Sequence, residues 1–157
     1  MVQHDSPQVH YTIHADGGAR GNPGPAGAGA MIRDELGNSV AAVSKFLGHR
    51  TNNFAEYEAV ILAFEELAKI VPPASQKKTG VMVKMDSELV VKQMNKVYKV
   101  KHPIMKEQYA RLTRAMSPFG SVSFAHVRRE QNKDADALAN EAMDGGTNSS
   151  PTPRSSP

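Results

Sequence analysis

The sequence predicts one α/β domain built on a mixed five-stranded sheet, with three antiparallel strands followed by two parallel crossover strands and flanking helices. Three observations predict this class. The first third of the chain alternates apolar and polar residues between glycine-rich turns, which is typical of consecutive antiparallel strands. After Thr51 the apolar spacing becomes helical. Short apolar runs between the later helices match buried strands, so the chain must cross over the sheet twice.

The antiparallel strands are expected at the beginning of the chain. Val9–Asp16 alternates apolar residues with His, Thr and Asp, and the glycine-rich segment Gly17–Gly24 is expected to be a loop. Small residues then lead into a second strand that reaches Arg33. A turn at Asp34–Asn38 connects it to the return strand, Ser39–Leu47.

The helical part is expected to begin at Thr51–Asn53, whose side chains can accept hydrogen bonds from free backbone N–H groups. This helix should end at Pro72. A buried strand around Val83 ends at Asp86, and Ser87 can cap a second helix.

The last part of the chain predicts two more helices and one strand. Pro103 opens a helix that ends before Pro118. A strand around Val122–Phe124 and a short helix, Lys133–Met143, complete the fold.

The domain is expected to span residues 9–144. A flexible N-terminal segment, 1–8, is expected before it. The segment 145–157 is rich in Ser, Thr, Pro and Gly with little to bury, so it is expected to be a disordered tail.

The composition excludes several classes of protein. Without cysteine the chain has no disulfide framework and no thiolate zinc site, which fits a reducing cytoplasmic location. No run approaches the ~18 apolar residues of a membrane span, and the N-terminus lacks the apolar segment of a secretory signal. No amphipathic stripe is left over for an interface. We therefore expect a cytoplasmic monomer without a membrane partner.

The distribution of charge points weakly to a polyanionic partner. The net charge is only +3, but seven Lys or Arg and one acid, Glu107, lie between Lys92 and Arg114. A solvated helical face explains such a run equally well, so the charge leaves both interpretations open.

Acidic residues stand at three positions where a structural role is hard to find. Asp16 and Asp86 end strands next to a connection, where open α/β sheets commonly place their sites, although either could be a turn residue. Glu56 shares a helical stripe with Val60 and Phe64. A charge on that buried face is costly unless it is paired or bound to a cation. A favourable interaction with the helix dipole is the alternative.

The fourth acid is ambiguous from spacing alone. Asp134 and Asp136 both fall at the start of the last helix, where capping is the usual reason for an acid. If one of them converges with the three other acids, the site carries a charge of about −4 that only cations can neutralise. Mg²⁺ or Mn²⁺ suits such an all-oxygen site, and two ions could promote phosphodiester hydrolysis. The histidines lack the spacing of a zinc site.

Four segments together resemble the motifs of type 1 ribonucleases H, in the family's order and over about residues 9 to 143. These segments are Asp16–Gly27, Thr51–Ala59, Asp86–Val90 and Asn132–Ala139. The resemblance implies a ribonuclease H-like fold. It also implies an endonuclease that cuts the RNA strand of an RNA–DNA hybrid, leaving 5′-phosphate and 3′-hydroxyl ends.

The resemblance also implies the site. The catalytic and metal-binding residues would be Asp16, Glu56, Asp86 and Asp136, with Asp134 as a bystander. Two Mg²⁺ ions would be the cofactor, with Mn²⁺ as a substitute.

Substrate contacts are carried over from the family by position. The backbone of Gly17 and Gly18, with Asn22, Asn53 and Glu56, would touch RNA 2′-hydroxyls, the group that distinguishes RNA from DNA. Thr51 and Asn53 would hold a DNA-strand phosphate, although helix capping explains this segment as well. Glu88 matches a substrate-contacting position where relatives commonly carry Gln, and its carboxylate lacks the amide group of that Gln. Lys96, Lys99 and Lys101 could meet DNA-strand phosphates.

The chain departs from the family pattern in one connection. Some relatives carry a catalytic His between the last strand and the last helix, and this chain has none there. Arg128, Arg129 or Glu130 could assist product release instead. Two other functions stay open: a hybrid-binding module without turnover, and a nuclease that acts on duplex DNA or duplex RNA.

Overall fold

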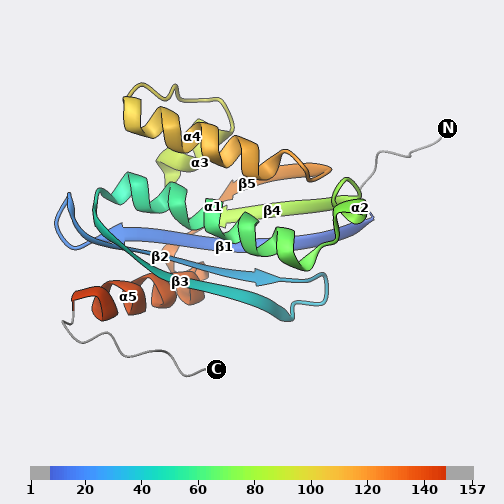
Figure 1. Ribbon diagram of the computed structural model, residues 1–157, viewed down its shortest axis with the longest axis horizontal. Coiled ribbons are helices and arrows are strands. Elements are labelled where there is room, and N and C mark those ends of the chain that lie inside the picture. The colour runs from blue at the N-terminus through green and yellow to red at the C-terminus, as the bar shows by residue number, and fades with distance from the viewer. Residues whose placement is uncertain (1–7, 148–157) are drawn as a thin grey trace.

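The predicted mixed sheet is confirmed by the computed structural model, which describes residues 8–147 (Figure 1). The strands lie in the order β3-β2-β1-β4-β5. Their bounds are β1 Val9–Ala19, β2 Gly24–Arg33, β3 Ser39–Arg50, β4 Thr79–Met85 and β5 Ser121–His126. β1 pairs antiparallel with β2, and β2 with β3, whereas β4 pairs parallel with both β1 and β5.

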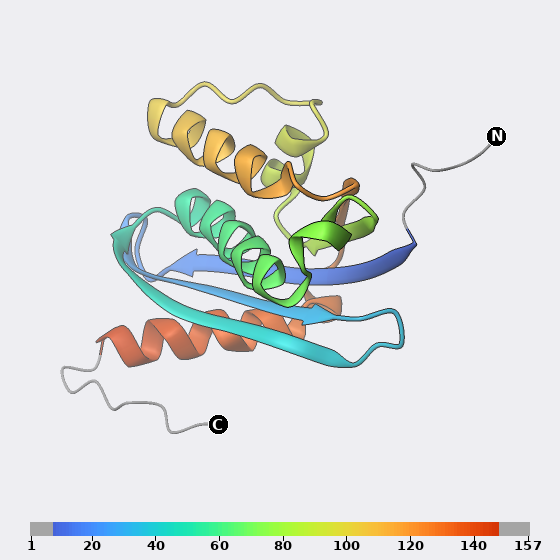
Figure 2. The same ribbon diagram turned by 45° about the vertical axis from the view of Figure 1, so that its right-hand side comes forward.

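The helices cover both faces of the sheet. Their bounds are α1 Asn52–Ile70, α2 Pro73–Gln76, α3 Glu88–Met94, α4 Pro103–Met116 and α5 Lys133–Thr147, with a 3₁₀ turn, η1, at Arg129–Gln131. α1 and α5 lie on opposite faces of the sheet (Figure 2) and both contact β1, β2 and β3. α4 packs on α1, and α3 contacts β5. No helix within residues 8–147 has the length and apolarity to cross a bilayer.

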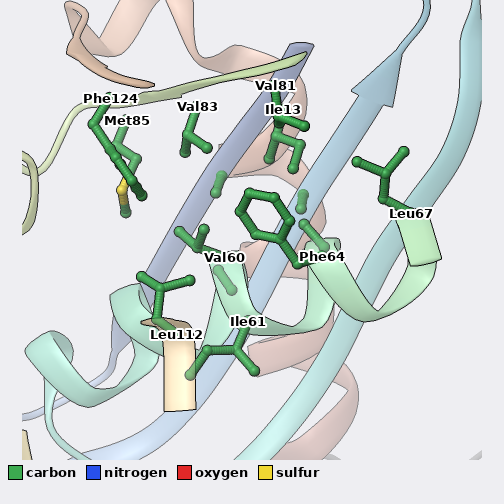
Figure 3. Close-up of a cluster of buried hydrophobic side chains, with 14 of the residues drawn as sticks. Ile13, Val60, Ile61, Phe64, Leu67, Val81, Val83, Met85, Leu112 and Phe124 are labelled. Atoms are coloured by element: carbon green, nitrogen blue, oxygen red, sulfur yellow. The ribbon is translucent and has the colours of Figure 1, made fainter. Parts of the chain in front are cut away.

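The main hydrophobic core lies between the sheet and α1. Phe64 and Val60 point from α1 toward Ile13 and Val83 on the central strands (Figure 3), and all four side chains are buried. The helix begins where the sequence predicts, because the Thr51 hydroxyl accepts a 3.2 Å hydrogen bond from the Phe54 backbone N–H. Capping and core packing therefore fix the position of α1 along the central strands.

β1 is longer than predicted. It continues through the first glycines to Ala19, because Gly17, Gly18 and Ala19 pair in register with Ala28, Gly27 and Ala26 of β2. The loop expected at Gly17–Gly24 is therefore shorter, and the predicted start of that loop is wrong. Backbone pairing requires no side chain, so glycines that signal a loop in sequence can extend a strand.

Both predicted domain boundaries need correction. Gln8 was assigned to the flexible N-terminus, but its backbone N–H donates to the Lys78 carbonyl at 2.8 Å. α5 continues to Thr147, so the tail predicted from residue 145 begins too early. Gly146 lies directly against the Phe46 ring of β3, with no room for a β-carbon. This contact of the last helical turn with the sheet was not visible from composition. The remaining predicted segments, 1–7 and 148–157, lie outside the described residues.

Candidate active site

Two of the predicted acids lie at neighbouring strand positions. Ala15 of β1 pairs with Met85 of β4 in the parallel register. Asp16 and Asp86 follow these residues directly, so the pairing places the two carboxylates next to each other. This juxtaposition depends on the order of the strands and on the register in which β1 and β4 pair.

Glu56 reaches the same place from α1. A β-carbon built on Gly17 would fall 2.6 Å from the Glu56 backbone nitrogen and even closer to the Ala55 carbonyl. The first turn of α1 therefore lies directly on the β1 backbone beside Asp16. The Glu56 Oε1 atom accepts a 2.9 Å hydrogen bond from the Ser87 hydroxyl, which also joins it to the residue after Asp86.

The structure distinguishes between the two candidate acids at the start of the last helix. The buried Asn132 side-chain amide donates to the Ala15 carbonyl at 2.9 Å. The backbone carbonyl of Asn132 accepts from the Asp136 N–H at 3.0 Å. These bonds hold the start of α5 against β1. Asp136 thereby lines the pocket that contains Asp16, whereas Asp134 is half-exposed and pairs with Arg33.

All four proposed acids line one pocket of about 580 Å³. Five further residues that the sequence analysis proposed for substrate contact or product release also line this pocket: Gly17, Gly18, Asn53, Glu88 and Arg129. Within residues 8–147 no three His, Cys, Asp or Glu side chains stand close enough to form a finished metal cage. The acids therefore border an open pocket rather than a closed cluster.

The electrostatics of the pocket are dominated by burial and crowding of negative charge. Burial raises the pKa of Asp16 to about 8, followed in size by the charge of Asp86 and by a hydrogen bond with Asp136. Burial also raises the pKa of Glu56 to about 7; the Ser87 hydroxyl acts against this shift and the charge of Asp86 adds to it. The protein alone thus stabilises protons on two of these carboxyls near neutral pH.

We expect the metal-free protein to lose stability as the pH rises. Asp and Glu of the unfolded chain have pKa values near ~4, whereas the folded chain holds protons on Glu56 to about pH 7 and on Asp16 to about pH 8. The folded state therefore binds more protons in this interval, and the free energy of unfolding falls with pH. The contribution is complete below pH ~4 and is lost as the pH passes these folded-state values.

Thermal unfolding in EDTA at acid and alkaline pH would measure this loss. Asp16→Asn cannot ionise and should weaken the pH dependence. An identical pH dependence of Tm in wild type and Asp16→Asn would contradict the assignment of the raised pKa.

Several pocket residues were not identified from the sequence. Ser87 was recognised only as a helix cap, and it also binds Glu56. The Asn52 side chain accepts from the Ala19 N–H at 2.7 Å, and Arg20 donates to Asn140 at 3.3 Å. Their roles depend on contacts between distant segments, which no local pattern reveals.

Of the three residues considered as substitutes for a loop histidine, Arg129 reaches the pocket. Its guanidinium lies 3.7 Å from an Asp136 carboxylate oxygen and is largely exposed. Glu130 lines a different hollow, beside His14 and Asn132. Arg129 is therefore the member of this group placed to act near the acids.

Some predicted substrate contacts lie outside the acid pocket. Thr51 caps α1, and Asn22 accepts a 2.9 Å hydrogen bond from the Asn52 N–H. Glu88 lines the pocket edge and pairs with Lys92 at 2.7 Å, so its carboxylate is engaged within its own helix. The three lysines predicted to meet DNA, Lys96, Lys99 and Lys101, lie on the connection between α3 and α4. The structure does not bring them into the acid pocket.

The fold and the pocket together define a ribonuclease H-like domain, with an acid-lined site beside the ends of its central strands. Residues 14–142 match the family described as Reverse transcriptase-like.

Named ribonucleases H are similar to this chain in sequence and structure. The N-terminal ribonuclease H domain of Rv2228c from Mycobacterium tuberculosis is 39% identical, with a TM-score of 0.79 over 86% of this chain and 99% of that one. LC11-RNase H1, isolated from compost by a metagenomic approach, is 46% identical, with a TM-score of 0.82 over 88% of this chain and 99% of that one. Ribonuclease HI of Halobacterium salinarum is 37% identical over 134 residues, which are 84% of this chain and 64% of the relative.

The chain therefore belongs to the type 1 ribonuclease H family. It spans only 37% of the length of the complete bifunctional protein Rv2228c, to which it is 42% identical over 142 residues.

Proposed function

We propose that this chain is an endonuclease that hydrolyses the RNA strand of RNA–DNA hybrids and leaves 5′-phosphate and 3′-hydroxyl ends. One observation carries the proposal: four acids from four separate segments, Asp16, Glu56, Asp86 and Asp136, line a single pocket. A second structure of LC11-RNase H1, with 45% identity to this chain, is a complex with an RNA/DNA hybrid. This complex supports the hybrid as substrate.

The donor set fits two hard divalent cations, Mg²⁺ or Mn²⁺. The four proposed ligands are carboxylates, and such oxygen ligands are preferred by these ions. Burial raises the pKa of Asp16 and of Glu56, and the charge of Asp86 raises both further; bound cations would relieve this unfavourable placement of negative charge. Bound ions would supply neutralisation of the developing phosphate charge and activation of water.

Other steps, namely holding the ions, orienting a carboxylate and attracting phosphate, are assigned to individual residues of the chain. Asp86, directly after β4, and Asp136 on α5 both raise the pKa of Asp16, so Asp16 would help to hold either ion. The Ser87 hydroxyl binds one oxygen of Glu56 and orients its carboxylate. The exposed Arg129 guanidinium, near Asp136, can attract a phosphate of the substrate or product.

Substrate recognition would use groups at the rim of the pocket. The Asn53 side chain and the backbone at Gly17 and Gly18 border the acids and are placed to meet RNA 2′-hydroxyls. The lysines between α3 and α4 would add attraction for phosphates, so affinity should fall as salt rises.

A substrate panel tests the proposal. The purified chain would be incubated with hybrid, duplex DNA, duplex RNA and DNA containing one ribonucleotide, each with Mg²⁺, with Mn²⁺ or with EDTA. We expect cleavage of the RNA strand of the hybrid only with a divalent ion, and end-labelling should identify the product ends. Cleavage in EDTA, or preferential cleavage of duplex DNA or duplex RNA, would refute the proposal. Binding of hybrid without cleavage under any condition would favour a binding module.

A further inference from the structure

Two further hollows lie beyond the acid pocket, along the connection between α3 and α4. Leu89 lines both the acid pocket and a second hollow of about 450 Å³. Tyr98 and Lys99 line both this second hollow and a third, of about 370 Å³, that reaches Tyr109 on α4. Because neighbouring hollows share lining residues, they lie next to one another along this surface. The second and third hollows together are here called the Tyr98 track.

The sign of the charge reverses where the track leaves the acid pocket. Four lysines line the Tyr98 track, and no Asp or Glu among the described residues does so. These lysines are Lys96, Lys99, Lys101 and Lys106. The surface next to the acids is therefore complementary to a polyanion.

The track also exposes apolar and aromatic surface, which phosphate binding alone does not require. Val97 is 66% exposed and Tyr98 is 45% exposed. The Lys92 ammonium lies 5.1 Å from the centre of the Tyr98 ring and is held in turn by Glu88. The Tyr98 ring therefore contacts a cation and also lines both hollows of the track.

We propose that the Tyr98 track binds single-stranded nucleic acid that continues from the hybrid in the acid pocket. A base stacks on Tyr98, and the lysines contact the phosphates on either side. A positive groove combined with an aromatic platform is the chemistry that binds unpaired strands with little sequence preference. Bases within a duplex are stacked on each other and cannot use such a platform. The continuity with a bound hybrid rests on the proposed function, whereas the binding itself requires no hydrolysis.

Fluorescence anisotropy with a labelled oligo-dT strand tests the binding without involving catalysis. We expect Tyr98→Ala to weaken binding about tenfold, in the range observed for loss of one stacked base. Tyr98→Phe keeps the ring and should bind like wild type. Leu36→Ala, which removes an 85% exposed apolar side chain from the β2–β3 turn, is the matched control and should have no effect. Undiminished binding by Tyr98→Ala would overturn the proposal.

A second experiment connects the track to the substrate. Cleavage of a blunt hybrid would be compared with cleavage of the same hybrid carrying single-stranded dT extensions. The extension should lower KM for wild type and for Tyr98→Phe but not for Tyr98→Ala, with kcat unchanged. If Tyr98→Ala raises KM equally for both substrates, the surface contacts the duplex and the proposal is wrong. Absence of cleavage together with ring-dependent oligo-dT binding would refute the proposed activity and leave this inference standing.

Discussion

Asp86→Asn is expected to abolish cleavage of the hybrid, with a loss in kcat of at least about 10³-fold, while hybrid binding is retained. The substitution keeps the size of the side chain but removes one negative charge from the pocket shared with Asp16 and Glu56. Loss of a metal-binding carboxylate removes several kcal/mol of transition-state stabilisation, which corresponds to this loss in rate. Single-turnover cleavage and equilibrium binding, measured on the same preparation, would separate the two effects.

The chain contains a matched control for this prediction. Asp134 lies near Asp136 on the same helix, but it is half-exposed and paired with Arg33 outside the acid pocket. Asp134→Asn should cleave like wild type, whereas Asp136→Asn should behave like Asp86→Asn. Normal cleavage by Asp86→Asn would show that the four-carboxylate assignment is wrong, and loss of cleavage by Asp134→Asn would show that the wrong acid of the pair was chosen.

Gly17→Ala should damage both folding and activity. The added methyl group would collide with the backbone of Ala55 and Glu56, and backbone atoms cannot rotate away as a flexible side chain can. We expect a loss of about 3 kcal/mol in the free energy of unfolding, or roughly 6–12 °C in Tm. Displacement of Glu56 from Asp16 should also lower kcat by about 10²-fold.

Gly18→Ala is the control for Gly17→Ala. Its added methyl group would meet Met143 and Asn52 side-chain atoms only at 3.7 and 3.9 Å, which are ordinary contact distances. Thermal unfolding of this variant should therefore stay close to wild type. Equal damage from both substitutions would point to a general intolerance of the glycine segment and not to the close approach of α1 to β1.

The parts of the fold that follow local patterns could be predicted from the sequence. Alternation along β1, the caps Thr51 and Ser87, and the strand end before Asp86 indicated the order of elements and one position of the site. Asp16 was singled out as a strand end, although its strand continues to Ala19. The connection order then required the crossovers of β4 and β5. Spacing alone also placed Glu56 on the buried face of its helix.

Contacts between distant segments could not be predicted in this way. The choice between Asp134 and Asp136 required either the family resemblance or the structure, since both acids fit the start of a helix. The bond from Ser87 to Glu56 joins residues on different helices. The last turn of α5 is held by a ring from β3 next to Gly146. Each of these features depends on which surfaces meet after folding, and a local reading of composition misses them.

The position of Asn132 has a consequence for the effect of substitutions at this residue. Its side-chain amide is tied to the strand residue before Asp16, and its backbone carbonyl is tied to the backbone of Asp136. One residue that lines none of the acid pocket therefore joins β1 next to Asp16 to the start of the helix that carries Asp136. Natural or laboratory substitutions there would impair turnover while leaving every ionisable ligand intact, and would be mistaken for a folding defect unless the spacing of those two carboxylates were measured.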